Sequence, residues 1–219
     1  MKNKLIIIGG GSLLNVSAEI VFLSKKINLV GYISEKKTPY KNIYNIKYLG
    51  SMNDISNKQI EKFEFILAVG DNFLRYKIYK KLLKKFNKIS FVNLIHPSVI
   101  ISKNTKIGKG NIICGNSNIN INTQIGNFCI LNSRNSIDHD NEISDFVGTG
   151  PGVTTGGHVV INKFSFLGIN SSIKNNIIIN ENSIVAGGSF LRKNTKKNSI
   201  YSGVPAKFLK ERLVGEKYL

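Results

Sequence analysis

The apolar residues of the chain follow two different patterns, which meet near residue 95. Before that point, short apolar runs alternate with segments of helical period, as in "KLIIIGG" (4–10) and "NVSAEIVFLSKK" (15–26). Strands are expected within 4–10, 28–34, 63–70 and 89–95. Helices are expected around 15–26, where Val16, Ile20 and Leu23 share a face, and over 71–86, with a cap at Asp71 or Asn72. Such alternation predicts βαβ units and a parallel sheet.

After residue 95 an aliphatic residue recurs every six positions without insertion or deletion. Of the sixteen positions from Ile101 to Leu191 in steps of six, fourteen are Ile, Leu or Val, and the other two are Thr149 and Thr155. Small residues such as Ser117 stand two positions earlier. Neither a helix nor a simple strand has a period of six, whereas a parallel β-helix with three faces per coil does. The run corresponds to about five coils.

The segment "TGPGVTTGGHVV" (149–160) therefore belongs to the repeat, although it resembles a loop. At two of the six-residue repeat positions, where an aliphatic side chain is expected to point into the β-helix, the segment has threonine. Several glycines are close to these threonines in the sequence. A local departure inside a regular pattern is typical of a functional site. The departure adjoins "SIDHDNE" (136–142), in which His139 stands between Asp138 and Asp140. A histidine beside a carboxylate has the chemistry of a general base.

Composition narrows the functional classes. The 219 residues carry a formal net charge of +18, which favours anionic partners, although a Lys-, Asn- and Ile-rich composition accounts for the charge equally well. The basic residues are dispersed, so nucleic-acid binding is not expected. Two cysteines are too few for a disulfide framework or a metal cage. Neither a signal peptide nor a run long enough to cross a membrane is seen, which predicts a cytoplasmic protein.

Two further motif interpretations are weaker. The turn "GGGSLL" (9–14) has Leu14 where a dinucleotide fingerprint requires a third glycine, and the chain lacks a second sheet half, so NAD binding is not expected. A phosphate at the start of the following helix fits the turn better. The three histidines, His96, His139 and His158, include no closely spaced pair of the kind that a zinc site of a γ-class carbonic anhydrase needs. No metal is therefore expected.

The hexad repeat resembles that of the hexapeptide-repeat acyltransferases, as do four short motifs. These are "NLIHPS" (93–98), "LGINS" (167–171), "VAGGS" (185–189) and "SGVPAK" (202–207). More narrowly, the chain is similar over its full length to bacterial sugar acetyltransferases of the sialic acid O-acetyltransferase and bacillosamine N-acetyltransferase type. The resemblance implies a Rossmann-like α/β domain over 1–95 that binds a nucleotide-sugar. An all-β left-handed β-helix over 96–219 then transfers acetyl groups.

The resemblance also implies a homotrimer in which acetyl-CoA lies in a groove between neighbouring β-helices. It assigns proton removal to His139, supported by Asp140 or, less favourably, by Asp138. It places the cofactor at Gly148, Gly157, Ile169 and Gly187, and the nucleotide-sugar at Gly10, Gly11, Ser12, Glu35, Gly70 and Asp71. An amide of the Gly156–Gly157 pair is expected to stabilise the oxyanion. Leu13 and Gly148 stand where many members of the family carry histidine.

The expected activity is acetyl-CoA-dependent N-acetylation of a nucleotide-linked amino-deoxysugar. A neutral amine is already nucleophilic, so a single His–Asp pair suffices for its attack on a thioester. O-acetylation of sialic acid is the alternative reaction. An inactive β-helix scaffold that only binds nucleotide-sugars is the alternative outside the enzymes.

Overall fold

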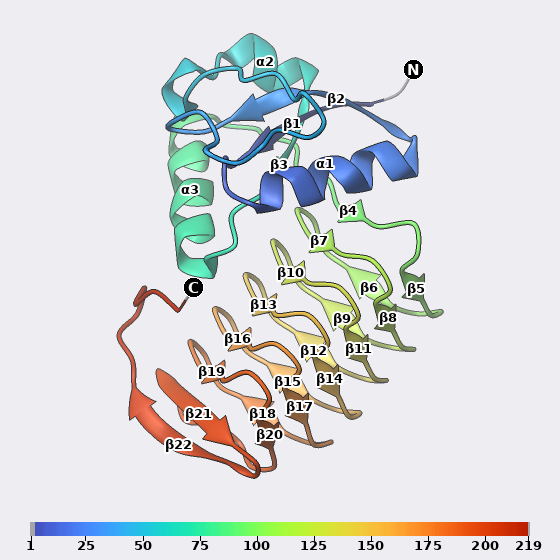
Figure 1. Cartoon of the computed structure of the whole chain (residues 1–219), viewed down its shortest axis with the longest axis vertical. Helices are drawn as coiled ribbons and strands as arrows, with labels where there is room; N and C mark the ends of the chain where they lie inside the picture. The colour runs from blue at the N-terminus through green and yellow to red at the C-terminus, as the bar shows by residue number, and fades with distance from the viewer. Residues whose placement is uncertain (1–2, 219) are drawn as a thin grey trace.

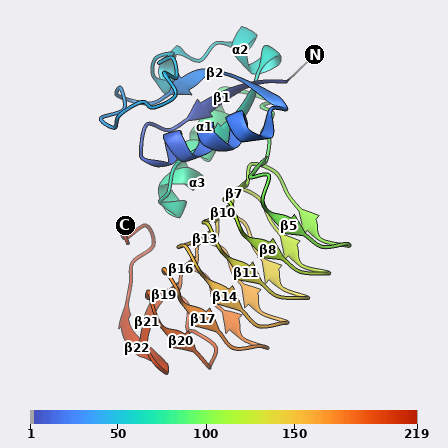
Figure 2. The same ribbon diagram turned by 45° about the vertical axis from the view of Figure 1, so that its right-hand side comes forward.

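The computed structural model describes residues 3–218, which form two parts (Figure 1). A small α/β part contains the N-terminus, and a stack of short strands extends away from it to a C-terminal hairpin. The turned view in Figure 2 shows the same stack, with one strand of each face lying above the next. Within the described residues, no helix combines the length and the apolar character needed to cross a membrane.

The N-terminal part is a three-stranded parallel sheet with helices packed around it. Its strand order is β2-β1-β3, so the first strand is central and is completely buried over Leu5–Ile7. The elements are β1 (Asn3–Ile8), α1 (Leu13–Ser24), β2 (Ile27–Ile33), the 3₁₀ turn η1 (Met52–Asp54), α2 (Asn57–Lys62), β3 (Glu64–Leu67) and α3 (Asn72–Lys85). The strand expected within 89–95 is shorter than expected and belongs to the other part. Phe91 makes only an isolated bridge with Phe65, and β4 (Leu94–Ile95) pairs with β7 (Ile112–Ile113) of the β-helix rather than with the α/β sheet.

Both expected helices are present, but the buried face of α1 is not the one expected. Asp71 caps α3, because its Oδ1 accepts a hydrogen bond from the Leu74 N–H at 2.7 Å. Helix α1 buries Leu14, Ser17, Ala18, Ile20 and Val21, whereas Val16 and Leu23 are 36% and 50% exposed. The face that Val16, Ile20 and Leu23 share is therefore not the buried face of the helix, since Ile20 alone of the three is buried. The sheet and the first β-helix coils together cover the α1 face that contains Leu14 and Val21.

The C-terminal part is a parallel β-helix with three faces. Each two-residue strand ends on an inward position, and equivalent strands pair in parallel 18 residues apart, as Ile119, Ile137 and Thr155 do. The first face contains β4 (Leu94–Ile95), β7 (Ile112–Ile113), β10 (Ile130–Leu131), β13 (Gly148–Thr149), β16 (Phe166–Leu167), β19 (Ile184–Val185), β21 (Ser199–Gly203) and β22 (Ala206–Glu211). The second contains β5 (Ile100–Ile101), β8 (Asn118–Ile119), β11 (Ser136–Ile137), β14 (Thr154–Thr155), β17 (Ser172–Ile173) and β20 (Phe190–Leu191). The third contains β6 (Lys106–Ile107), β9 (Gln124–Ile125), β12 (Glu142–Ile143), β15 (Val160–Ile161) and β18 (Ile178–Ile179).

The coil count slightly exceeds the expected five. Strands β4 to β18 make five complete coils, and β19 and β20 begin a sixth. The antiparallel pair β21–β22 then closes the end of the stack. The last parallel strand, β21, is thereby paired on both sides, and β22 becomes the edge strand of this sheet.

The six-residue repeat is explained by the interior of the coil. The inward aliphatic side chains form one continuous core, in which Ile113, Ile119, Leu131, Ile161 and Leu191 are fully buried. The small residues two places earlier turn the chain at the edges. For example, the Ser117 hydroxyl donates to the Asn132 carbonyl at 3.1 Å, and Thr123 donates to the Asp138 carbonyl at 2.8 Å.

The three faces of the β-helix form a prism, and the turns between neighbouring faces are its edges. The backbone conformation repeats regularly along these edges. Every sixth residue from Asn104 to Gly188 has a positive φ, and most of these are asparagine or glycine, which tolerate the left-handed region well. We call the edge that contains residues 132–135 the first edge, that of 138–141 the second and that of 144–147 the third, together with their equivalents in other coils. Asp140 (φ 56°) and His158 (φ 56°) are consecutive left-handed residues of the second edge.

The α/β part is fixed on the third edge by helix α3. Phe128, Phe146 and Phe164 are equivalent residues of successive coils, and Tyr76 and Tyr79 of α3 pack on their rings with centroid separations of 4.5–5.8 Å. Arg75 lies fully buried in the same contact. The C-terminal segment returns to this junction, where the Tyr218 hydroxyl accepts a hydrogen bond from the Asn72 N–H at 3.1 Å. The two parts therefore share one buried, well-packed contact.

Candidate active site

His139 lies on the second edge of the prism, between β11 and β12. Residues of this edge stack directly on those 18 positions away, so His139 lies beside Gly157 and Asp140 lies between Asn122 and His158 in its column. Neighbouring coils therefore determine the surroundings of the histidine.

Asp138 holds the backbone of the edge. Its Oδ1 accepts hydrogen bonds from the Asn120 side chain at 3.0 Å and from the His139 N–H at 2.8 Å. Its own N–H donates to the Thr155 hydroxyl at 3.2 Å. One of the two threonines that interrupt the aliphatic repeat is thus explained: Thr155 ties the edge with His139 to the next coil.

Asp140 is the carboxylate that contacts the imidazole. Its Oδ2 lies 2.7 Å from His139 Nδ1, and its Oδ1 accepts a hydrogen bond from the Asn122 side chain at 3.1 Å. The hydrogen bond that His139 donates to Asp140 raises the pKa of His139, and the hydrogen bonds that Asp140 accepts from His139 and Asn122 lower the pKa of Asp140. Of the two aspartates that flank the histidine, Asp140 is therefore the one placed to support it.

The contact with Asp140 also determines which ring nitrogen of His139 is free. An ionised carboxylate only accepts hydrogen bonds, so the neutral imidazole must donate from Nδ1. The proton of neutral His139 is then on Nδ1, and the lone pair is on Nε2. The His139 side chain is 43% exposed, so Nε2 is accessible to a substrate. This arrangement is that of a general base.

Gly157 provides the space in which the His139 ring lies. A Cβ atom on Gly157 would be 2.5–3.0 Å from three atoms of that ring, which is closer than carbon atoms approach. The neighbouring Gly156 N–H donates to the Ile173 carbonyl at 2.9 Å. Within residues 3–218 the Gly157 N–H has no hydrogen-bond acceptor. Of the two amides expected at an oxyanion site, that of Gly157 is the available one.

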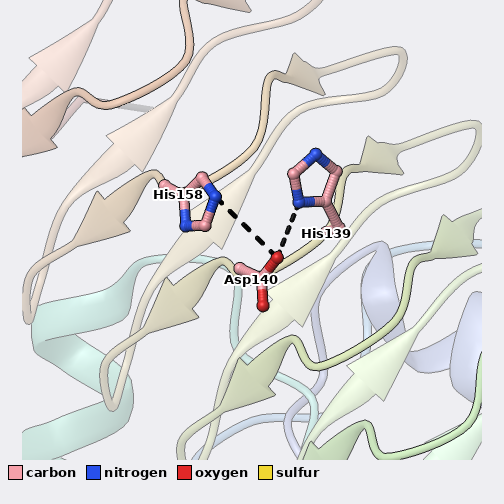
Figure 3. A group of neighbouring side chains, drawn as sticks. All are labelled: His139, Asp140 and His158. Carbon is pink, nitrogen blue, oxygen red and sulfur yellow. Dashed lines mark hydrogen bonds and ion pairs between the residues drawn. The ribbon is translucent and has the colours of Figure 1, made fainter.

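His158 is a member of this group that the sequence analysis missed. Its Nε2 lies 3.9 Å from Asp140 Oδ2, and its ring meets that of His139 edge-on with centroids 5.2 Å apart. Figure 3 shows the Asp140 carboxylate between the two imidazoles. The sequence contained the signal, since His158 follows His139 by one coil of 18 residues plus one. Its position becomes meaningful only when the coil length is used to align the edges.

A separate pocket of about 790 Å³ lies between the α/β part and the β-helix. The structure brings nine of the expected ligand-binding residues together there: Gly10, Gly11, Ser12, Glu35, Gly70, Asp71, Gly148, Ile169 and Gly187. The expected cofactor residue Gly157 is not among the lining residues. A volume of this size is typical of small-molecule sites.

The glycine turn at one end of the pocket suits an anion. Ser12 is the N-cap of α1 but makes no side-chain cap. The Leu14 N–H donates to the Gly11 carbonyl at 3.0 Å, whereas the Leu13 N–H has no acceptor within residues 3–218 and is left for a ligand. Gly9 has a φ of 137°, and a Cβ there would be 2.3 Å from the Ala68 carbonyl oxygen, so only glycine fits. Among the described residues, no lysine or arginine lines the pocket. The overall basic charge is therefore not focused on this site.

The pocket and His139 lie on different parts of the prism. The β-helix residues of the pocket belong to the first face and the first edge, whereas His139 and Asp140 belong to the second edge. The second face, which contains β11 and β14, separates the two edges. The expected catalytic pair and the expected ligand contacts are therefore not brought together within one chain.

Comparison with known proteins provides the context for this arrangement. Residues 4–82 match the family of the PglD N-terminal domain. The whole chain is similar in structure to a variant of perosamine N-acetyltransferase from Caulobacter crescentus, solved with CoA and GDP-perosamine, at 24% sequence identity and a TM-score of 0.87. That comparison covers 95% of this chain and 98% of the other.

Two other solved structures are also similar in fold to this chain. The acetyltransferase domain of PglB from Neisseria gonorrhoeae, in complex with acetyl coenzyme A, has 22% identity and a TM-score of 0.86. WeeI from Acinetobacter baumannii has 22% identity and a TM-score of 0.79. Both comparisons cover 95% of this chain and all of the other. The chain has the fold of these acetyltransferases. The resemblance and the fold class expected from the sequence are thereby confirmed.

Gly148, which stands where many hexapeptide-repeat sugar acetyltransferases carry histidine, is buried in this chain. A Cβ atom on Gly148 would lie 3.0 Å from the Phe166 ring, and Phe166 itself packs on Tyr218 with centroids 4.5 Å apart. These two rings occupy the space beside the glycine. Leu13 begins α1 and lines the pocket. Both departures from the usual pattern thus make the pocket more apolar.

Proposed function

We propose that the protein transfers the acetyl group of acetyl-CoA to the amino group of a nucleotide-linked amino-deoxysugar. The observation that carries the proposal is the His139–Asp140 pair, held at 2.7 Å with the base nitrogen exposed. The fold shared with a protein solved with CoA and GDP-perosamine supports the choice of substrates. A cytoplasmic location stays a prediction.

In the proposed reaction, the neutral amine attacks the thioester carbonyl. His139 Nε2 removes the proton that the amine loses as the new C–N bond forms, and the Asp140 carboxylate stabilises the resulting imidazolium. The Gly157 N–H donates to the oxyanion of the tetrahedral intermediate. The C–S bond then breaks, and CoA leaves as a thiolate that takes up the proton. No covalent enzyme intermediate is needed.

We assign the nucleotide to the part of the pocket formed by the α/β domain. The amides at the start of α1 face the pocket and suit a diphosphate. Glu35, at the end of β2, is placed to accept hydrogen bonds from ribose hydroxyls. The acetyl-CoA contacts are assigned to Ile169 and Gly187 on the first edge, where Ile169 is 54% exposed.

We further propose that a complete site needs two chains of a homotrimer. Because the first and second edges face different directions in one chain, His139 of one copy must meet the ligand contacts of a neighbour. A threefold arrangement of the three-sided coils allows every edge of one kind to face an edge of another kind. This places the acetyl-CoA groove between copies.

A mixing experiment tests the shared site. Gly187→Trp should block the ligand groove, because even a Cβ atom at this position would lie 2.9 Å from the Ile169 side chain. His139→Ala should remove the base. Each variant alone should be nearly inactive. Co-expressed with two different tags and purified through both, the mixed assemblies should regain measurable acetyl transfer, because some sites then combine an intact groove with an intact base.

The controls separate the possible outcomes. Doubly tagged assemblies of the single variants should stay inactive. If mixed assemblies form but recover no activity, the groove and the base act within one chain, and the proposed site is wrong. If no doubly tagged assembly forms and light scattering gives a monomer mass, the homotrimer is excluded.

The acceptor is tested by offering a panel of sugars. Thiol release from acetyl-CoA should be fastest with UDP-, dTDP- or GDP-linked amino sugars, and free and CMP-linked sialic acid should react little. Rapid acetylation of sialic acid alone would replace the proposal by O-acetylation. Binding of nucleotide-sugars without thiol release, in protein that also binds acetyl-CoA, would favour the inactive scaffold.

A further inference from the structure

The group of His139, Asp140 and His158 has a geometry that acetyl transfer does not require. We propose that His139 Nδ1, Asp140 Oδ2 and His158 Nε2 form a binding site for a divalent transition-metal ion, with Zn²⁺ as the best match, and that the bound ion switches off the base. The binding step is independent of the proposed function. Only the inhibitory consequence rests on it.

The three ligand atoms are already close together. They all lie within 4.8 Å of one another, with Asp140 Oδ2 at 2.7 Å from His139 Nδ1 and at 3.9 Å from His158 Nε2. Ligands at about 2.0–2.1 Å from a tetrahedral zinc ion are separated from one another by roughly 3.3 Å. The first of these separations must therefore open by about 0.6 Å and the second must close by about 0.6 Å. The third, between the two ring nitrogens, is at most 4.8 Å and must come to the same value, and rotation of the exposed side chains can make these adjustments.

The backbone that carries these ligands is fixed by the coil. The His158 N–H donates to the His139 carbonyl at 3.1 Å, so the two histidines are held on adjacent coils. Asn122 donates to the other oxygen of Asp140 at 3.1 Å, which orients the carboxylate in the way that outer hydrogen bonds orient metal ligands. The three side chains are 43%, 34% and 59% exposed, so a water molecule can complete the coordination.

The chemistry of the ligands selects the class of ion. Two imidazoles and one carboxylate suit zinc, cobalt and nickel, whereas calcium and magnesium prefer sites made of oxygen ligands only. The ligand set has the composition of catalytic zinc sites, but here one ligand is also the proposed base. The ion is therefore an inhibitor rather than a cofactor.

Metal binding changes the position of the proton on His139. In the metal-free pair the ring proton is on Nδ1, and Nε2 has the lone pair that removes a proton from the amine. An ion on Nδ1 needs the lone pair of that nitrogen, so the single proton of the neutral ring must move, through solvent, to Nε2. No proton is gained or lost by the ring. With Nε2 protonated, His139 cannot act as a base.

His158 is the residue that distinguishes this site from a simple His–Asp pair. The equivalent positions of the neighbouring coils are Asn122, Asp140 and Asn176, all in the left-handed conformation. Since asparagine is the usual residue at such positions, His158→Asn removes a ligand without disturbing the backbone. The change leaves the His139–Asp140 hydrogen bond in place. It is therefore a specific probe of the metal site.

The test begins with binding. Chelator-treated protein is titrated with Zn²⁺ by calorimetry and with Co²⁺ by visible absorption, using wild type, His158→Asn and, as a matched control, His96→Asn. His96 bonds to Ser98 at 2.8 Å near the start of the β-helix, outside the group. Wild type and His96→Asn should bind one ion per chain, and His158→Asn should bind at least tenfold more weakly. Circular dichroism checks that the variants fold.

A second measurement needs no variant. In wild-type protein labelled with ¹⁵N histidine, Zn²⁺ should shift the resonances of His139 Nδ1 and His158 Nε2. With an active sample, Zn²⁺ should inhibit acetyl transfer, chelator should restore it, and His158→Asn should lose this sensitivity. The metal site is wrong if wild type binds no Zn²⁺ below about millimolar concentrations or if His158→Asn binds as tightly as wild type. If Zn²⁺ binds but does not inhibit acetyl transfer, only the inhibitory role of the ion is wrong. If Zn²⁺ binds to protein that shows no acetyl transfer in its absence, only the proposed function is wrong.

Discussion

Replacing His139 with alanine is expected to lower kcat for acetyl transfer by about 10²–10⁴-fold, the usual contribution of a general base. The reason is that the Asp140 contact leaves Nε2 as the accessible base nitrogen. The dissociation constants for acetyl-CoA and the nucleotide-sugar should change little, because His139 does not line the interdomain pocket. Steady-state kinetics with chelator present, together with equilibrium binding, measure both quantities.

The two neighbouring aspartates provide a matched pair of controls. Asp140→Asn offers an amide N–H to Nδ1 and so favours the tautomer with a proton on Nε2, which predicts a large loss of kcat. Asp138→Asn makes the same chemical change but keeps the oxygen that accepts from Asn120 and the His139 N–H, so its loss should be smaller. Wild-type kcat in His139→Ala, or a larger loss for Asp138→Asn than for Asp140→Asn, would contradict the assignment of the base.

The β-helix was predictable because its sequence period is a direct consequence of its structure. Inward positions such as Ile137 recur as aliphatic residues because they fill one continuous core, and edge residues such as Ser117 bond to the next coil. The N-terminal part has no such repeat. The segment 89–95, expected to end the α/β part with a strand, contributes β4 (Leu94–Ile95) to the first coil of the β-helix instead. The pattern of apolar residues alone does not show whether such a segment pairs with the α/β sheet or with the first coil of the β-helix.

The candidate site was predictable where neighbours in sequence are neighbours in space. His139 and Asp140 are adjacent residues, and their pairing follows from one left-handed turn. His158 contributes from the next coil, and Gly157 matters because of the ring that lies against it. Both relationships depend on the vertical alignment of coils. The interdomain pocket depends further on how α3 docks, which the sequence pattern leaves open.

The docking of α3 rests on a charged residue to which the sequence pattern gave no role. Arg75 lies within "DNFLRYKIYKKLLKKF" (71–86), the segment expected to form a helix. In the structure it is fully buried, and burial lowers the pKa of its guanidinium. A buried guanidinium is stable only when its donors are satisfied. Here backbone carbonyls of both parts of the chain satisfy them.

Arg75→Ala is expected to lower the free energy of unfolding by about 3 kcal/mol or more, since hydrogen bonds to a charged group contribute roughly 1.5–3 kcal/mol each. Arg75 Nη1 donates to the carbonyls of Val69 at 2.6 Å and Gly70 at 2.9 Å, and Nε donates to the Phe128 carbonyl at 2.8 Å. Removing the side chain leaves these buried carbonyls without a partner and opens a cavity beneath the aromatic rings. Urea denaturation followed by circular dichroism measures the loss.

Two variants and one functional measurement make the Arg75 prediction specific. Arg75→Lys keeps the charge but lacks the planar fork that bridges Gly70 and Phe128, so an intermediate loss is expected. Leu83→Ala, on the same helix but 41% exposed, should have little effect. Because Arg75 also fixes the Val69–Gly70 segment that lines the pocket, Arg75→Lys should raise KM for the nucleotide-sugar more than KM for acetyl-CoA. Wild-type stability in Arg75→Ala would show that the aromatic contacts alone hold the two parts together, and equal changes in both KM values would show that Arg75 does not position the pocket.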